Sequence, residues 1–341
     1  MTKTAAIVGL SFAGITNSVC SAFRTLGWDV QPFLYDPPPR NVVLRQWDKL
    51  TDTNGSHLGH SFNTVLRDEV IPSVRQRKPD LLLVLKGEKL EEDTMEQLQG
   101  LQVPLLSWVY DSLERCPGQM DIAQIARHAF CIDGADAERM GVHGTWLPVG
   151  YDDAIYWPRC RFEEKDFDIL FTGTIAGALT NDYTVRRECL LELSASGLAD
   201  RYHCGFIGTT GTHLGDFRLR KQLLIPCIAS YLSPDALAGY LSRAKVCINV
   251  HQDDGGKPVN PMFFAIPGAG TCQVAEARPY LATWLEPERE YVPFDSGCLV
   301  ERLEQLLADQ PTLREICDAG QRAASSSHTF VQRIAFMIGY L

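Results

Sequence analysis

The stretch 246–274 constrains the fold more than any other part of the sequence. It begins with apolar residues at alternate positions, Val246, Ile248 and Val250, which is typical of a buried strand. A polar loop then leads to Asn260, which suits a helix N-cap because proline follows it at the first helical position. A strand, a loop and a helix start in this order predict an α/β fold, with free backbone N–H groups beside the positive end of a helix dipole.

The helix after this loop is short and ends in glycines. Met262, Phe263 and Ile266 recur at helical spacing, and Gly268 and Gly270 permit the tight turn into the next strand. We expect the backbone amides of this region to hold a phosphate group.

The same order of strand, turn and helix recurs along both halves of the chain. Strands are predicted at residues 4–8, 30–35, 80–86, 104–111 and 129–133 in the first half, and at 167–172, 203–208, 246–251 and 271–274 in the second. The third of these is apolar almost throughout, as a parallel sheet covered on both faces demands. The predicted fold class is therefore α/β with two Rossmann-like domains, and the linker-like residues 156–165 put the boundary near residue 160.

Composition narrows the class of protein. The formal net charge of −10 and the isoelectric point near 5.3 argue against broad nucleic-acid binding, which needs clustered Lys and Arg. The eleven cysteines are scattered, with no spacing typical of a zinc site. Since no apolar run is long enough for a membrane span and none suits a signal peptide, we expect a cytoplasmic enzyme.

Three short motifs in the second half of the chain resemble those of a known family. They are Asn-x-x-x-Phe-x-Ile-Pro-x-x-Gly at 260–270, Glu-Tyr-Val-x-Phe at 290–294, and Ser-His-Thr-Phe at 327–330 with an arginine three residues further on. Together they resemble the C-terminal half of the CgeB-like glycosyltransferases, a group of the GT-B superfamily named for a spore-maturation protein. The resemblance covers the second half of the chain well and the first half more loosely.

This resemblance implies a GT-B fold, in which two Rossmann-like domains face a central cleft. Residues 1–158 would form the acceptor-side domain, residues 159–325 the donor nucleotide-binding domain, and residues 326–341 a helix that packs back on the first domain. The implied reaction moves a hexose or pentose from a nucleotide-diphosphate donor, most often a UDP-sugar, to an acceptor hydroxyl. No metal or other cofactor would be required, because a positive helix end can replace the cation. The acceptor stays open between a glycan, a protein, a small molecule and a hydroxylated nucleic-acid base, and the reaction is either retaining or inverting.

The donor site is expected at the strand ends of the second domain. A turn of small residues after its first strand can approach the donor phosphates, and one of the adjacent Arg186 and Arg187 can reach a diphosphate. The amides of 266–271 would stabilise the charge on the departing diphosphate. The residues expected to bind the donor are Gly173, Thr174, Arg187, Asn249, His251, Lys257, Asn260, Gly268, Ala269, Gly270 and Thr271.

Two acids found in many related enzymes are missing. Many nucleotide-sugar GT-B enzymes carry two glutamates with seven residues between them, and this sequence has Lys257 and Ala265 at those positions. The relatives also often carry an arginine where Met262 stands. Either Glu276 or Glu290 holds the ribose instead, or the donor is unusual, or the transferase activity is lost. Lys257 is a candidate to offset the missing arginine.

Acceptor-side residues are expected near the carboxyl ends of the first-domain strands. Asp111, in a Trp-x-x-Asp motif shared with the family, is the first candidate for the catalytic or acceptor-orienting carboxylate, and the alternative is an acid that caps the next turn. In the polar loop 53–60, His60 is the candidate general base and His57 an acceptor contact; the alternative for each is a solvated loop histidine. The remaining acceptor-side candidates are Ser11, Phe12 and Lys86.

Two other functions stay open at this point. The turn from Gly9 to Gly14 and the acid at Asp36 resemble a dinucleotide-binding motif, although its middle glycine is absent, so an oxidoreductase is one alternative. A catalytically inactive GT-B binding module is the other, suggested by the missing glutamates.

Overall fold

The computed structural model describes residues 2–11, 14–36, 56–175, 183–211, 214–251 and 257–341. Contacts divide the chain into two compact units. The first comprises Met1–Val149, Gly256–Pro258 and Phe330–Leu341, and the second Gly150–Gly255 and Val259–Thr329. The division therefore falls before the predicted boundary, and the C-terminal segment groups with the first unit.

The first unit is built on a parallel sheet of six strands in the order β2-β1-β3-β4-β5-β6. The two strands at its centre, β3 and β4, are buried along their whole length, which is why the sequence shows unbroken apolar runs there. The strands are β1 (Thr4–Gly9), β2 (Asp29–Leu34), β3 (Leu81–Leu85), β4 (Leu105–Val109), β5 (His128–Cys131) and β6 (Gly144–Trp146).

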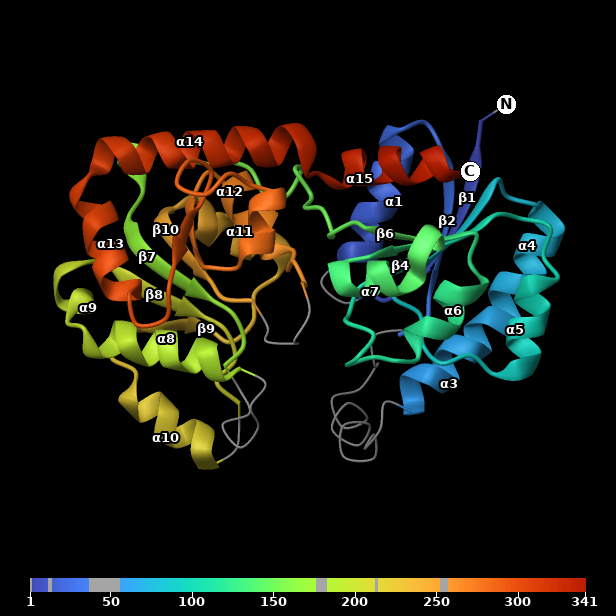
Figure 1. Ribbon diagram of the computed structural model, residues 1–341, viewed down its shortest axis with the longest axis horizontal. Helices are drawn as coiled ribbons and strands as arrows, with labels where there is room; N and C mark the ends of the chain where they lie inside the picture. The colour runs from blue at the N-terminus through green and yellow to red at the C-terminus, as the bar shows by residue number, and fades with distance from the viewer. Residues whose placement is uncertain (1, 12–13, 37–55, 176–182, 212–213, 252–256) are drawn as a thin grey trace. The chain divides into compact units, whose positions relative to one another are not determined.

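Helices cover both faces of this first sheet (Figure 1). On one face α1 (Ile15–Thr25) and α15 (Phe330–Met337) share a core with alternate residues of β1, β3 and β4. The other face is covered by α3 (Ser56–Val65), the π-helix η2 (Leu66–Val70), α4 (Ile71–Arg77), α5 (Glu92–Gln99) and α6 (Gln119–Ile125). Helix α7 (Gly134–Met140) packs beside β5 and β6, and the 3-10 helices are η3 (Gly141–His143) and η6 (Ile338–Tyr340).

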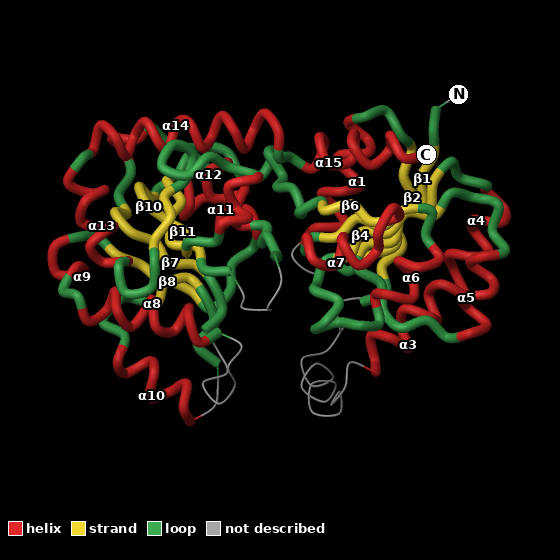
Figure 2. The backbone as a smooth tube through the Cα atoms, in the orientation of Figure 1, coloured by secondary structure: helices red, strands yellow, loops and turns green. Residues whose placement is uncertain are grey.

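The second unit has a parallel sheet of the same size, in the order β12-β11-β10-β7-β8-β9. Figure 2 shows each sheet as a layer between helices. The strands are β7 (Phe167–Thr172), β8 (Cys204–Ile207), β9 (Cys227–Ala229), β10 (Ala244–Asn249), β11 (Cys272–Glu276) and β12 (Val292–Phe294). The helices are α8 (Thr184–Ala195), α9 (Leu198–Arg201), α10 (Leu214–Gln222), α11 (Pro234–Ser242), α12 (Met262–Gly268), α13 (Leu299–Ala308) and α14 (Gln310–Ser327), with 3-10 turns η4 (Phe162–Glu164) and η5 (Pro279–Thr283).

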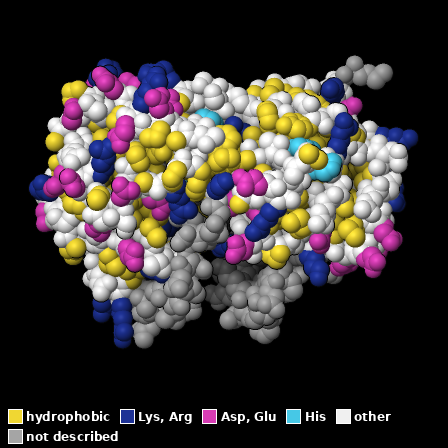
Figure 3. Space-filling view, in the orientation of Figure 1, with side chains coloured by type: hydrophobic (Ala, Val, Ile, Leu, Met, Phe, Trp, Pro, Cys, Tyr) yellow, Lys and Arg dark blue, Asp and Glu magenta, His cyan; other side chains and the backbone are white. Residues whose placement is uncertain are grey.

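Apolar side chains hold this second unit together on both faces of its sheet. One core joins the strands to α8, α9, α13 and α14, and a smaller one joins them to α11 and α12. The prediction of an α/β chain with two parallel sheets is confirmed. In the part of the chain that the structure describes, no helix is both long and apolar enough to cross a bilayer. Basic and acidic side chains are interspersed over the face drawn in Figure 3.

Candidate functional site

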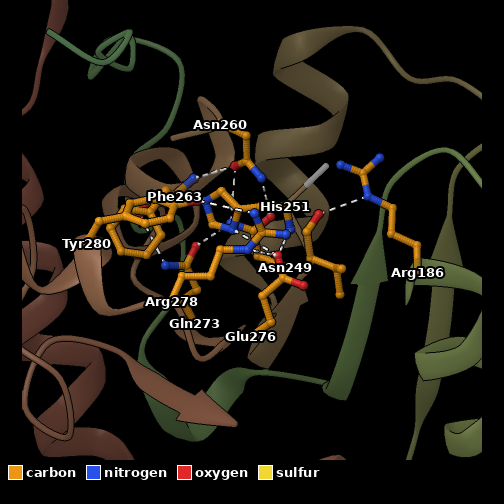
Figure 4. Close-up of polar contacts among 10 residues, drawn as sticks. Arg186, Asn249, His251, Asn260, Phe263, Gln273, Glu276, Arg278 and Tyr280 are labelled. Carbon is orange, nitrogen blue, oxygen red and sulfur yellow. Dashed lines mark hydrogen bonds and ion pairs between the residues drawn. The ribbon is translucent and has the colours of Figure 1, made fainter. Parts of the chain in front are cut away.

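Three amide side chains join the end of β10 to the start of α12 in the second unit. Asn249 Nδ2 donates to Asn260 Oδ1 at 3.2 Å and to Gln273 Oε1 at 3.0 Å, and Asn260 Nδ2 donates back to Asn249 Oδ1 at 2.9 Å. Asn260 Oδ1 also accepts the backbone N–H of Phe263 at 3.1 Å, the capping role that the sequence predicts for it. The network, drawn in Figure 4, therefore fixes the two ends of the loop at the carboxyl edge of the sheet.

His251 lies next to this network and is buried. Its backbone N–H donates to Glu276 Oε1 at 2.7 Å, and its ring Nδ1 lies 3.7 Å from the same oxygen. Among the described residues, neither ring nitrogen has a hydrogen-bond partner. Burial, and then the positive charges of Arg278 and Arg186, lower the pKa of His251 to about 3, so its imidazole is neutral at working pH.

Glu276, at the end of β11, carries the negative charge of this site. Arg278 Nε lies 2.8 Å from Glu276 Oε1, and both side chains are largely buried, with 17% and 12% of their surface exposed. Burial raises the pKa of Glu276 above its ordinary value, although the charge and hydrogen bond of Arg278 work in the opposite direction. Arg278 also donates from Nη1 to the Tyr280 hydroxyl at 3.3 Å.

A second arginine reaches the same edge from α8. Arg186 Nε donates to the carbonyl of Val250 at 2.9 Å, and Nη1 donates to the carbonyl of Thr174 at 3.4 Å. Its neighbour Arg187 instead donates to the Thr184 hydroxyl at 3.0 Å, within its own helix. Of the two arginines it is thus Arg186 that contacts the carbonyls at the strand ends: the helix begins at Thr184, and its phase turns Arg186 toward them.

The turn after β7 brings Gly173 and Thr174 to the same edge. Gly173 has a φ of 143°, which favours glycine, and the amide of Ile175 continues the pairing with the carbonyl of Thr209 at 2.9 Å. A Cβ on Gly208 would overlap the carbonyl oxygen of Gly173, so only glycine allows the two strand-end turns to approach this closely.

The expected phosphate-binding turn is at the wrong end of its helix. Residues 268–271 follow the C-terminus of α12, where the dipole is negative, and the amides of Ala269, Gly270 and Thr271 donate to carbonyls of the same helix. Ala269 and Thr271 are fully buried, and Thr271 Oγ1 donates to the carbonyls of Leu241 and Ala244. A Cβ on Gly268 would overlap the Tyr151 ring, so this turn is a packing feature and its amides are already used.

Lys257 makes its contacts with residues of the first unit. It belongs to the short segment that groups with the first unit, where its backbone N–H donates to Asp133 Oδ1 at 2.8 Å. Its ammonium group lies 2.8 Å from Glu138 Oε1. This ion pair is exposed, and it lies among residues that group with the first unit.

Lys86 and Asp111 meet at the carboxyl edge of the first sheet, as expected from the ends of β3 and β4. Lys86 Nζ lies 3.6 Å from Asp111 Oδ2 and 3.2 Å from Glu88 Oε1. Lys86 has a φ of 66°, uncommon for a residue with a side chain, and Gly87 has a φ of 82°. Gln119 holds the backbone carbonyl of Asp111 through Nε2 at 3.3 Å.

The remaining acceptor-side candidates have different outcomes. Ser11 donates from its backbone N–H to Asp36 Oδ1 at 2.5 Å, while Phe12 lies outside the described residues. His57 and His60 lie in α3, so the prediction of a loop there is wrong, and their side chains are outside the described part. Ser11 donates to both carboxylate oxygens of Asp36, so a ribose bound there would have to share this acid with the turn after β1.

Three site residues carried no strong sequence signal. Arg186 is adjacent to Arg187 and cannot be distinguished from it by spacing, Glu88 stands two residues after Lys86, and Arg278 stands two residues after Glu276. The pair Glu276 and Arg278 and the pair Lys86 and Glu88 each lie at or just after the end of a buried strand. This position is the signal in the sequence that points to them. Among the described residues, no group of three His, Cys, Asp or Glu side chains is placed to hold a metal ion.

Comparison with known proteins gives a family match for the second half of the chain. A family model described as glycosyl transferase-like matches residues 210–339. A search of curated proteins found no match.

Solved structures similar to this chain extend over its whole length. Sucrose-phosphate synthase from Thermosynechococcus elongatus has a TM-score of 0.66 at 14% identity, covering 99% of this chain and 98% of that one. An alpha-glucosyltransferase in complex with UDP and a 13-mer DNA containing an HMU base has a TM-score of 0.64 at 10% identity, covering 100% and 99%. A structure described as a UDP-N-acetylglucosamine 2-epimerase from Listeria monocytogenes has a TM-score of 0.60 at 10% identity, covering 95% and 94%.

These similarities identify the class of fold. The two six-stranded parallel sheets with helices on both faces form the GT-B fold, and the prediction of that fold is confirmed. Residues 210–339, which include β10, α12 and β11 and all the labelled residues of Figure 4 except Arg186, carry the match to the glycosyl transferase-like family.

Proposed function

We propose that the protein is a glycosyltransferase that moves a sugar from a nucleotide-diphosphate donor, a UDP-sugar, to an acceptor hydroxyl. The observation that carries the proposal is the pair of guanidinium groups, Arg186 and Arg278, at the carboxyl edge of the second sheet (Figure 4). Ligands of open α/β sheets bind at this edge, and arginine presents paired donors that match phosphate oxygens. The family match and the UDP in the complex of the similar alpha-glucosyltransferase support the same donor class.

In this proposal the second unit holds the donor. Arg186 and Arg278 bind the diphosphate and stabilise the negative charge that grows on it as the sugar leaves, a role that a preorganised cation fills well. Gly173 and Thr174 let the backbone approach the phosphates, and Glu276 takes over the ribose contact of the missing glutamates. The positive charge needed by the leaving group then comes from side chains, and we propose that transfer is metal-independent and insensitive to chelators.

In the same proposal the first unit holds the acceptor, with Asp111 or His60 as the catalytic group on that side. The CgeB-like subgroup remains our assignment for the chain on the strength of its three motifs.

An oxidoreductase is disfavoured by the contact between Ser11 and Asp36. An inactive module would bind UDP without turnover, and an epimerase would change the donor sugar in place.

The first test is UDP binding by calorimetry to the wild type, Arg186→Met, Arg278→Met and Arg187→Met. Losing a charged hydrogen bond typically costs about 1.5–3 kcal/mol, so we expect the dissociation constant to rise about tenfold or more for the first two variants. Arg187→Met is the matched control, since it removes the same charge from the adjacent residue, and it should bind like the wild type.

The second test is release of UDP from a panel of UDP-sugars, with and without EDTA. Release of UDP identifies a transferase or its slow hydrolysis of the donor, whereas conversion of the sugar without release would identify an epimerase. A wild-type protein that does not bind UDP, or binds it equally well after both arginine substitutions, would contradict the proposal.

A further inference from the structure

The carboxyl edge of the first sheet contains a second cluster of charged groups, outside the proposed donor site. In the strand order β2-β1-β3-β4, the chain passes from β1 to β2 on one side and then to β3 on the other side, so the topological switch point lies between the carboxyl ends of β1 and β3. Open α/β sheets place ligands at this point. Lys86 and Glu88 directly follow β3 here, and Asp111 follows β4.

The positive charge in this cluster is already balanced. Lys86 Nζ lies 3.2 Å from Glu88 Oε1 and 3.6 Å from Asp111 Oδ2, with 17%, 18% and 39% of the three side chains exposed. Burial works to lower the pKa of Lys86, but the charges of Glu88 and Asp111 outweigh it and raise that pKa. Asp36, held by Ser11, adds a further carboxylate close to the Tyr35 hydroxyl. The cluster therefore combines three carboxylates with a single ammonium group.

Two buried polar atoms beside these charges have no hydrogen-bond partner in the described part of the chain. Tyr35 is fully buried, and its hydroxyl is one of them. Burial, and then the charges of Glu88, Asp36 and Asp111, raise the pKa of Tyr35, so this hydroxyl lies close to the carboxylates and stays protonated. The other is Glu88 Oε1, which pairs with Lys86 by charge without hydrogen-bond geometry. The cluster thus places the buried Tyr35 hydroxyl near carboxylates, one of which, Glu88, is in an ion pair with Lys86.

We propose that Lys86, Glu88 and Asp111, with the Tyr35 hydroxyl, bind the acceptor, and that this acceptor is an uncharged polyhydroxyl compound such as a saccharide. The inference rests on the proposed transferase function and names its acceptor class. Carboxylates accept hydrogen bonds from neutral hydroxyl groups, and the Tyr35 hydroxyl can donate or accept one. A phosphorylated sugar or a nucleic acid would instead bring negative charge beside three carboxylates, whose single ammonium group is already paired.

The experiment measures acceptor-stimulated UDP release with matched pairs of acceptors. The pairs are methyl glucoside with glucose 6-phosphate, methyl galactoside with galactose 6-phosphate, and N-acetylglucosamine with its 6-phosphate; a 13-mer DNA containing a hydroxymethyl base is added as a polyanion. We expect at least one neutral acceptor to stimulate release at least tenfold more than its phosphorylated partner and than the DNA.

Variants separate a binding role from a structural one. Glu88→Gln should raise the KM for the neutral acceptor at least tenfold. It should also lower the ratio of UDP release with the neutral acceptor to UDP release with its phosphorylated partner, because it removes one negative charge while keeping the side-chain shape. Glu91→Gln is the control, since Glu91 pairs with Arg67 outside the cluster and should leave both quantities unchanged. A merely structural role of Glu88 would lower activity without altering the ratio between neutral and phosphorylated acceptors.

Failure of this inference is distinct from failure of the proposed function. A wild-type protein that neither binds UDP nor releases it from any donor would overturn the transferase function. A wild-type protein that releases UDP but prefers a phosphorylated acceptor or the DNA, responds to no neutral acceptor, or keeps its preference after Glu88→Gln would overturn the acceptor assignment alone.

Discussion

Replacing Arg278 with methionine tests the electrostatics of the second-unit site most directly. The substitution keeps an unbranched apolar stem but removes the charge that lies 2.8 Å from Glu276 Oε1. At an effective dielectric constant of about 20, two unit charges at that distance attract by about 6 kcal/mol. Breaking a buried pair from one side typically costs about 3–5 kcal/mol, because the remaining charge is left uncompensated.

The partial exposure of this pair reduces the expected cost. With 17% and 12% of the two side chains exposed, water stabilises part of the stranded Glu276 charge, and we expect a loss of about 2–4 kcal/mol at pH 8. For a unit of this size that corresponds to a fall in melting temperature of roughly 5–15 °C. Differential scanning calorimetry, following the transition of the second unit, measures it.

The dependence on pH gives the sharper test. Without Arg278, burial is opposed only by the backbone hydrogen bond of His251 and the charge of Arg186, so the folded-state pKa of Glu276 rises further above the unfolded value of about 4.5. A folded state with the higher pKa binds the proton more readily, so the variant regains stability relative to the wild type as the pH falls from 8 toward 5. Adding Glu276→Gln to the variant should restore most of the loss at pH 8, since glutamine keeps an acceptor for the backbone N–H of His251.

Two results would refute this reasoning. One is a stability deficit of Arg278→Met that is equal at pH 5 and pH 8. The other is a double variant no more stable than Arg278→Met itself, which would show that the lost packing of the arginine matters and the stranded charge does not. Arg289→Met is the control: Arg289 pairs with Glu286 on the exposed surface, and its substitution should leave the melting temperature unchanged.

The remaining predictions concern the turns and the buried histidine. Thr271→Val should lower stability by about 1 kcal/mol through the lost hydroxyl donor while leaving UDP affinity unchanged; weaker UDP binding in calorimetry would restore the turn as a phosphate site. Gly208→Ala should destabilise the second unit by about 2 kcal/mol or more in urea unfolding, because its Cβ overlaps the carbonyl oxygen of Gly173, and a stable variant would contradict this geometry. His251 has a folded pKa of about 3, below the ordinary 6.5, so the unfolded state binds its proton first and stability falls as the pH drops from 6.5 toward 3, by up to about 1.4 kcal/mol per unit. His251→Phe should remove that part of the fall, and an imidazole NMR signal that titrates near pH 6 would disprove it.

Periodicity predicted the fold because burial alone decides the pattern of a central strand. Residues 81–85 are buried on both sides of the sheet, so their apolar run identified a parallel strand without further information. The N-cap role of Asn260 was also predictable, since it depends only on the next three residues. Strand-end residues such as Lys86 and Asp111 followed from the rule that parallel strands end at one edge.

The site was predicted less well because its contacts depend on where each helix begins and ends. Arg186 and Arg187 are adjacent in the sequence. Which of the two faces the sheet depends on the residue at which α8 begins, and an error of two residues in that start is enough to exchange them. The turn at 268–271 contains glycines, which occur at either end of a helix. It follows the C-terminus of α12, so its amides are not the free amides predicted there. The pairing of Glu88 with Lys86, and of Arg278 with Glu276, follows from side-chain packing that spacing does not encode.

The grouping of the final segment with the first unit affects how the chain is made. Phe330, Ile334 and Met337 of α15 fill the same apolar core as Trp108 and Phe23. During synthesis on a ribosome, residues 1–149 therefore emerge with an open apolar face that stays uncovered until residues 330–337 have been translated. A fragment ending at residue 149 would keep this apolar face uncovered, and we expect it to aggregate more readily than the whole chain.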